Sequence, residues 1–508
     1  MITKLIEWCL KNRFVVLVFT GIIILWGIYA INRVPVDAIP DIGENQQIIF
    51  VDWPGRDAQT IEDQITYPLT TRLFGIPGVK TIRASSAFGF SMVYVIFHDW
   101  VDFYWCRSRI LEKLQQAQQF LPQGVVPVLG PDATGLGQVF WYTVEGDGYS
   151  LQELRTLQDW YIRYQLSAVE GVSEVASVGG FVKQYQIDID PNKLLIYGVK
   201  LGDVFNAVRN SNIDVGAKVV ERGGMEFIIR GVGFIKKIED IENIVVGSYN
   251  GTPVFIKNIA NVQLGPEFRR GVLDKAGKEV VGGVVIVRYK ENPLEVIKRV
   301  KQRIKELELG LPPGVKIVPF YDRTELIKRT INTLRDTLIL QIIITIIVVF
   351  VFLRHFTSNL IISFTLPLAV LISFIVMDYL KIDSNIMSLS GIAIAIGTLV
   401  DMGIIMTENA YRHLVQRSKF HPERSEGSLD SSPSAQNDFS PRRSQYRLEV
   451  IFEAAKEVGS AVITAILTTV VSFFPVFALE AQEGKLFRPL AYTKTFALLA
   501  SVFIALTL

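Results

Sequence analysis

The sequence contains few of the residues that form disulfide frameworks or metal clusters. Its 508 residues include only two cysteines, Cys9 and Cys106, and four scattered histidines, His98, His355, His413 and His421. Cys9 precedes the first long apolar run and Cys106 lies in the more polar stretch after it. We therefore expect the two thiols on opposite sides of a membrane, with no disulfide between them. No set of His and Cys residues has the spacing of a zinc site.

A large net charge of one sign is also lacking. The formal net charge is only +2, although 20% of the residues are charged. Without a basic excess the chain does not attract nucleic acid electrostatically, so we expect no nucleic-acid partner. The glycine pairs Gly179-Gly180 and Gly223-Gly224 lie in expected turns, and neither precedes a helix as a phosphate-binding loop does. A nucleotide-hydrolysing motor is therefore not expected.

Long apolar runs are abundant. Hydrophobic residues make up 49% of the chain, and a membrane-spanning helix needs about 20 largely apolar residues. Six stretches are long enough: 14–31, 337–353, 360–377, 386–411, 458–479 and 490–508. The first lacks the small-residue cleavage site of a secretory signal, so we expect an uncleaved anchor. The sequence predicts a polytopic α-helical membrane protein with six spans.

Basic residues indicate how these spans are oriented, because short cytoplasmic loops carry an excess of Lys and Arg. The basic residues gather before the first span, between the second and third, and between the fourth and fifth: Lys4, Lys11, Arg13, Arg354, Arg412, Arg417, Lys419, Arg424, Arg442, Arg443 and Arg447. We expect this face in the cytoplasm. The soluble block, about 34–336, then lies outside it, in the periplasm of a Gram-negative cell.

The soluble block contains an internal repeat. LPQGVVPVLGPD (121–132) and LPPGVKIVPFYD (311–322) each follow a charged amphipathic helix, and each is expected to end in a strand. The order strand, helix, strand, strand, helix, strand predicts a large α+β region of two ferredoxin-like βαββαβ repeats. The first repeat is expected at 35–132, and the second at 133–181 and 273–330. Residues 182–272 interrupt the second; we expect an inserted docking subdomain that reaches a neighbouring subunit, rather than a long loop.

The remaining boundaries place the first span in 1–34, the second to fourth in 331–419, and the fifth and sixth in 448–508. Between them, residues 420–447 differ in composition from their surroundings. The run HPERSEGSLDSSPSAQND is rich in Ser and Pro and almost free of large apolar side chains, so it cannot bury a core. We expect a disordered cytoplasmic insertion without chemistry of its own. A regulatory segment is the alternative.

Asp401 is the most informative single residue. It lies within GIAIAIGTLVDMGIIMTEN, where a charge at bilayer depth costs about 2.5–3.5 kcal/mol on the gentlest scale. We expect a buried carboxyl that alternates between neutral and charged forms; a permanently neutral carboxyl that joins helices is the alternative. Glu408, seven residues on, shares its helix face and is the candidate second member of a proton relay, or an interfacial charge. Lys494 is a candidate counter-charge, unless it reaches the interface.

Several segments resemble the resistance-nodulation-division (RND) family of membrane pumps. The matching segments are RVPVDAIPDIGENQQII, WPGRDAQTIEDQITYPLTTRLFGIPGVK, EVASVGGFVKQYQIDIDP and EAQEGKLFRPLAYTKTFA, and they are most similar to the heavy-metal efflux branch. The resemblance covers nearly all of the chain outside 420–445 and corresponds to the N-terminal half of such a pump. It implies a secondary active transporter of the inner membrane, a proton antiporter rather than an enzyme, without a cofactor beyond the transported metal ion and protons. It also implies a homotrimer in the lipid bilayer, joined by a periplasmic membrane-fusion adaptor and an outer-membrane channel.

Within this family, members that export different cargoes differ in the residues of the fourth span. Drug-exporting members typically carry two adjacent aspartates, but here Asp401 is followed by Met402. Members that handle zinc, cobalt or cadmium typically add an acidic residue six positions earlier, where Ala395 stands. The single membrane aspartate is therefore most similar to the copper(I)/silver(I) pumps. The resemblance implies proton-driven efflux of heavy-metal cations, above all these two.

Copper(I) and silver(I) prefer thioether and thiolate ligands. Met387, Met402 and Met406 on the Asp401 helix are therefore candidate metal ligands, with core packing as the alternative for each. Leu399 and Phe268 stand where copper/silver members tend to have Met, so a complete methionine relay is not expected. In such pumps the main periplasmic metal site and the basic partner of the membrane aspartate belong to the second half.

Two other interpretations are open from the sequence. One is a pump for organic amphiphiles on the same scaffold, which the absence of a second aspartate opposes. The other is a fragment, split or non-functional remnant of a metal pump, because the chain ends within the expected sixth span. A resistance profile and the DNA downstream of the coding sequence would discriminate among these possibilities.

Overall fold

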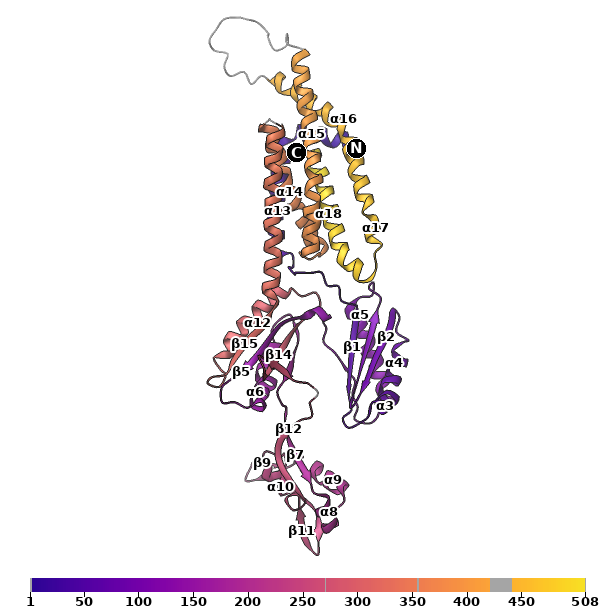
Figure 1. The fold of residues 1–508 in the computed structure, drawn as a ribbon, viewed down its shortest axis with the longest axis vertical. Coiled ribbons are helices and arrows are strands. Elements are labelled where there is room, and N and C mark those ends of the chain that lie inside the picture. Colours follow the sequence, from indigo (N-terminus) through magenta and orange to yellow (C-terminus); the bar gives the residue numbers. More distant parts are fainter. Residues whose placement is uncertain (1, 270, 354–355, 421–440, 508) are drawn as a thin grey trace.

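A computed structural model describes residues 2–269, 271–353, 356–420 and 441–507. Figure 1 shows three parts along the longest axis of the molecule. A bundle of long helices occupies one end, two α/β units lie beside each other below it, and a smaller unit forms the opposite end. The N- and C-termini both lie at the bundle.

In the described part of the chain, six helices are long and apolar enough to cross a membrane. They are α2 (Arg13–Arg33), α13 (Arg323–Leu353), α14 (Phe356–Leu380), α15 (Ile386–Phe420), α16 (Pro441–Ser472) and α18 (Ala481–Thr507). Each apolar run of the sequence falls in one of these helices, and the fifth run continues into the short helix α17 (Phe474–Phe477). The central pair is α15 and α18, which lie side by side in the bundle.

Two segments of the bundle differ from the sequence expectation. Residues 2–11 form a separate amphipathic helix, α1 (Ile2–Lys11), which buries Ile6 and Cys9 against the bundle. The expected disordered insertion at 420–447 is too long: residues 441–447 are the first turns of α16, while 421–440 lie outside the described residues. The sequence permits this helix, because a proline is tolerated in the first turn of a helix.

The first repeat follows α2 and contains a four-stranded antiparallel sheet with the order β4-β1-β3-β2. Its strands are β1 (Gln46–Asp52), β2 (Val79–Ala87), β3 (Phe90–Phe97) and β4 (Val128–Leu129). Its helices are α3 (Ala58–Ile61), α4 (Tyr67–Leu73) and α5 (Phe103–Ala117). Asp102 caps α5 by accepting a hydrogen bond from the Trp105 N–H. Cys106, Ile110 and Leu114 recur every four residues on α5 and are buried in the same core as the sheet residue Ile49.

The second repeat has the strand order β15-β5-β14-β6, with a short additional strand, β13, also paired to β14. Its strands are β5 (Gln138–Glu145), β6 (Val172–Gly179), β13 (Leu273–Lys275), β14 (Lys278–Val287) and β15 (Lys316–Asp322). The helices α6 (Leu151–Leu157), α7 (Arg163–Ser167) and α12 (Pro293–Glu308) contribute to its core. The corresponding strands of the two repeats thus follow the same order. β15 runs directly into α13, so the second repeat is continuous with the bundle.

The inserted subdomain lies between β6 and β13 in the chain, and at the end of the molecule opposite the bundle in Figure 1. Its elements are β7 (Lys183–Ile189), α8 (Pro191–Tyr197), α9 (Leu201–Ser211), β8 (Val215–Arg222), β9 (Met225–Gly231), α10 (Ile238–Glu242), β10 (Val245–Tyr249), β11 (Thr252–Phe255), α11 (Ile256–Ile259) and β12 (Ala260–Pro266). The β8–β9 hairpin is notable for exposed apolar side chains. Phe227 and Ile228 are adjacent and therefore point to opposite faces, yet both are exposed.

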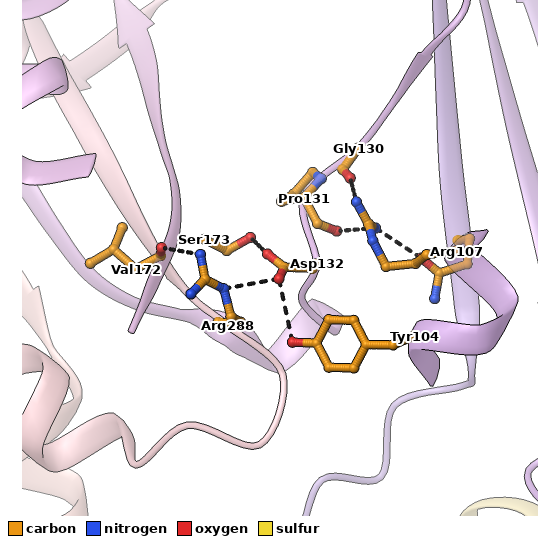
Figure 2. Close-up of polar contacts among 9 residues, drawn as sticks. Tyr104, Arg107, Gly130, Pro131, Asp132, Val172, Ser173 and Arg288 are labelled. Atoms are coloured by element: carbon orange, nitrogen blue, oxygen red, sulfur yellow. Dashed lines mark hydrogen bonds and ion pairs between the residues drawn. The ribbon is translucent and has the colours of Figure 1, made fainter. Parts of the chain in front are cut away.

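A polar joint connects the two repeats at Asp132, and Figure 2 shows it in detail. The Asp132 carboxylate accepts hydrogen bonds from Tyr104 of the first repeat (3.3 Å) and from Ser173 of the second. It also pairs with Arg288 of the second repeat, whose Nε lies 2.9 Å away. Phe103 stacks on Tyr289 beside it, with ring centroids 4.2 Å apart. Side chains from both repeats therefore hold the segment that links them.

Candidate functional site in the helical bundle

Asp401 lies on one continuous exposed face of α15. Ile394, Asp401, Ile405 and Glu408 are all exposed, and they recur at the spacing of a single helix face. The opposite face is closely packed: Ala395, Ile396 and Leu399, for example, are buried against α14 and α18. We call the exposed face the Asp401 stripe. In the part of the chain that the structure describes, no side chain pairs with Asp401.

The burial that the sequence predicts for Asp401 is therefore not supplied by the described residues. Placing a charged carboxylate between the exposed residues Ile394 and Ile405 costs free energy if the stripe faces lipid. Glu408, the other predicted relay residue, lies on the same stripe about 10 Å further along the helix axis. It has no ion-pair partner within the described segments either. The stripe is thus an exposed, largely apolar surface that carries two carboxylates.

Lys494 does not act as the counter-charge of Asp401 in this structure. Its Nζ lies 3.5 Å from the centroid of the Phe473 ring, at the junction of α16 and α17. The neighbouring residue, Thr493, donates a hydrogen bond to the carbonyl of Ser388, 2.7 Å away. Ser388 precedes Asp401 by thirteen residues, which is about 20 Å of helix. Lys494 is therefore near the soluble-domain end of the bundle, far from the carboxylate.

The three candidate methionines are distributed along α15 rather than gathered at one point. Met387 lies at the soluble-domain end, about 22 Å of helix from Met402. Met402 is buried among Val462, Ile466 and Leu498 of α16 and α18, and Met406 packs beside this cluster. Met387 is therefore too far away to share one ion with Met402 and Met406, which lie one helical turn apart. The three methionines are candidates for separate stations or for core packing.

A cavity of about 520 Å³ opens beside Met406, at the end of the bundle away from the soluble domains. Its lining comes from α1, α2, α14, α15, α16 and α18, and it includes Cys9 and Tyr411. On the adjacent turn, Asn409 donates a hydrogen bond to the Ala454 carbonyl (2.9 Å) and His413 pairs with Glu457 (2.8 Å). These contacts attach α15 to α16 at the same end as Glu408.

The loop between α14 and α15 carries Asp383, a carboxylate outside the spanning segments. Partial burial of the carboxyl, which disfavours its charged form, raises the pKa of Asp383 to about 6. The negative charges of Asp37 and Asp41 add to this shift, and the positive charge of Lys290 opposes it. Water still reaches the side chain, which is exposed on one side, so screening limits the consequence for stability. Because the folded chain binds this proton more tightly than the unfolded chain, the contribution of Asp383 to stability is complete below pH about 4. It is lost as the pH rises through about 6.

We expect Asp383→Asn to remove the part of the pH dependence of stability that comes from Asp383. The variant should melt at a higher temperature than the parent chain at about pH 7.5, and the difference should shrink or reverse at about pH 4.5. Thermal unfolding of the purified chain at both pH values measures this, with Asp378→Asn as the control, since Asp378 lies beside Lys381 (3.9 Å) instead. An equal difference in melting temperature between variant and parent at both pH values would contradict the raised pKa of Asp383.

Helices of spanning length, with a carboxylate inside one of them, are the features of a polytopic membrane protein in which that carboxylate is a candidate functional group. The chain belongs to the AcrB/AcrD/AcrF family, whose model matches residues 5–508, and so to the RND pumps. It is 44% identical to the cation efflux system protein CusA of Escherichia coli (strain K12) and 43% identical to the putative cation efflux system protein SilA of Salmonella typhimurium. It is 35% identical to the cation efflux system protein CzcA of Alcaligenes sp. (strain CT14).

These matches cover 99%, 99% and 100% of this chain but 47% of each relative. The crystal structure of a heavy metal efflux pump matches with a TM-score of 0.84 at 29% identity, over 99% of this chain and 48% of that one. The chain therefore spans about half the length of the relatives it matches. The resemblance to the heavy-metal branch that the sequence indicated is confirmed.

Proposed function

We propose that this chain is the N-terminal half of a proton-driven efflux pump for heavy-metal cations, with copper(I) and silver(I) as the preferred cargo. The observation that carries this proposal is a carboxylate, Asp401, between the exposed apolar residues Ile394 and Ile405 on one face of a spanning helix, in a chain related to cation efflux proteins. Members of the family are transporters rather than enzymes. Protons and the transported metal are the only small species that the mechanism requires.

In this mechanism a second helical half covers the Asp401 stripe and shields the carboxylate from lipid. Asp401 takes up a proton from the side of the soluble domains and releases it toward the other side, with Glu408 as the next acceptor. Loss and gain of charge change the preferred position of α15, because a charged carboxylate favours a polar or paired surrounding and a neutral one tolerates an apolar surrounding. Met387, Met402 and Met406 are the proposed stations for a soft cation along the same helix.

The proposed location is the inner membrane, with the two repeats and the inserted subdomain in the periplasm. The proposed assembly is a homotrimer in the lipid bilayer with a periplasmic adaptor and an outer-membrane channel. The β8–β9 hairpin supports the trimer, because its exposed Phe227 and Ile228 provide an apolar surface that another subunit can bury. No nucleic-acid partner is proposed.

The cargo is tested by the resistance profile of a metal-sensitive Gram-negative host that expresses the chain together with any downstream half. Raised tolerance to silver and copper, without raised tolerance to dyes and detergents, is the expected result. The opposite profile would favour the second candidate, a pump for organic amphiphiles. Unchanged tolerance to every compound from a well-expressed, membrane-inserted protein would favour a non-functional remnant.

A further inference from the structure

Two groups of polar contacts join the helical bundle to the two repeats, and each group joins it to a different repeat. The first group centres on Lys485, near the start of α18. Its Nζ lies 2.7 Å from the Asp99 carboxylate and donates a hydrogen bond to the Gly43 carbonyl at 2.5 Å. Asp99 follows β3 and Gly43 precedes β1, so both partners belong to the first repeat. We call these contacts the first anchor.

The second group centres on Arg323, the first residue of α13. Its guanidinium is buried; it lies 3.0 Å from the Asp37 carboxylate and donates to the Leu136 carbonyl at 2.7 Å. Leu136 lies immediately before β5 of the second repeat. Asp37 belongs to the extended segment 34–38 that follows α2. Arg323 thus ties the base of the second repeat to that segment, and we call these contacts the second anchor.

Backbone pairing continues the second anchor to α15. The Asp37 N–H donates to the Ser384 carbonyl (3.1 Å), the Ser384 N–H donates to the Pro35 carbonyl (2.8 Å), and the Ile386 N–H donates to the Ala38 carbonyl (3.2 Å). Ile386 is the first residue of α15. A continuous chain of hydrogen bonds therefore runs from the start of the Asp401 helix to Arg323 and the second repeat.

At this end of the bundle, α15 and α18 are closely joined. Thr493 of α18 donates to the Ser388 carbonyl of α15. Gly391 of α15 allows the approach, because a Cβ there would lie only 2.5 Å from the Leu490 carbonyl oxygen. A helix pair in such contact moves as a unit at this end. Lys485 extends from the same pair to the first repeat, and the backbone pairing of Asp37 with Ser384 links the second anchor to the start of α15, so both anchors connect to one rigid element.

We propose that Lys485 and Arg323 are positioning residues that attach the two repeats separately to the α15–α18 pair. A displacement of this pair reaches the first repeat through the first anchor and the second repeat through the second anchor. The repeats are joined to each other at Asp132 (Figure 2), so pulling on them at separate points changes the angle between them around that joint. The cause of the displacement, proton exchange at Asp401, rests on the proposed function. The attachment of the two repeats through Lys485 and Arg323 does not rest on it.

Spin-label distance measurements on the full chain in lipid nanodiscs test the attachment. One label replaces Tyr379, an exposed residue at the soluble-domain end of α14, and serves as the bundle reference. The second label replaces Gln115 on α5 of the first repeat or Glu308 on α12 of the second, both of which are exposed. The native cysteines are replaced by alanine beforehand. Each pair reports the position of one repeat relative to the bundle.

We expect Lys485→Gln to broaden or shift only the distance distribution to the first repeat, and Arg323→Gln only that to the second. Exchanging the charges, K485D with D99K, should restore the narrow first distribution. Because Arg323 is buried, Asp37→Asn is a milder variant that weakens the second anchor and leaves the bond to Leu136 in place. The control is Arg299→Gln, which removes an ion pair with Glu170 within the second repeat and should change neither distribution.

Unchanged distributions in folded Lys485→Gln and Asp37→Asn variants would overturn the proposal. So would a variant at either anchor that broadens both distances equally, since that result indicates general loosening. The experiment does not involve Asp401. A result against the anchors therefore leaves the proposed transport function standing, and failure of Asp401 to drive transport leaves the anchors standing.

Discussion

Asp401→Asn should reduce metal tolerance and metal transport to the level of membranes without the protein, while the chain still folds and inserts. Asparagine has the size of aspartate and, like the protonated carboxyl, both donates and accepts hydrogen bonds, but it has no proton to exchange near neutral pH. It also removes the unfavourable charge from the stripe, so the variant should be at least as stable as the parent chain. Tolerance plates and metal uptake into inverted vesicles measure the loss of function.

Two variants on the same stripe serve as controls for this loss. Ile405→Ala shortens an exposed apolar side chain four residues from Asp401 and should retain most of the transport activity. Glu408→Gln should cause a smaller loss than Asp401→Asn, because Glu408 is the second group of the proposed relay. If Asp401→Asn is expressed at the normal level and transports metal at the full rate, proton exchange at Asp401 is not the energy source of transport.

Gly391→Leu should separate α15 from α18 and lower both stability and transport. A side chain at this position meets the backbone of Leu490, which cannot move aside as a flexible side chain can. Overpacking of this kind costs about 1–3 kcal/mol, and the hydrogen bond from Thr493 to Ser388 is lost with the close approach. The melting temperature and the transport rate of the purified, reconstituted variant measure both effects.

Gly397→Ala provides a matched control for this prediction. Gly397 lies on the same helix, but a Cβ added there has no neighbour within 4 Å. Replacing glycine by alanine inside a helix stabilises it by about 0.5–1 kcal/mol, so this variant should melt at the same or a higher temperature. Equal destabilisation by both substitutions would show that the α15–α18 contact has no special importance.

The spanning helices were predictable because the bilayer imposes a length and an apolar composition on each segment separately. Asp401 was identifiable for the same reason, since a charge in such a segment is exceptional. Helix α1 was missed because ten residues are too few to span. Its signal was present nonetheless: Ile2, Leu5, Ile6 and Cys9 recur at helical spacing.

Contacts between distant parts of the chain had no comparable local signal. The position of Lys494 over Phe473 depends on how α18 meets the α16–α17 junction. The two anchors join Lys485 to Asp99 and Arg323 to Asp37, residues hundreds of positions apart. The exposure of the Asp401 stripe is likewise a property of the packed bundle. Periodicity showed that Asp401 and Glu408 share a face, but not which neighbours that face has.

Infrared difference spectroscopy of the Asp401 carboxyl during metal transport tests the central claim most directly. The claim is that this group exchanges a proton in every cycle. We predict a band of the protonated carboxyl that diminishes as metal-driven turnover begins, returns when turnover stops, and is absent from Asp401→Asn. Metal transport with no such change, and with Asp401 in one charge state throughout, would contradict the account.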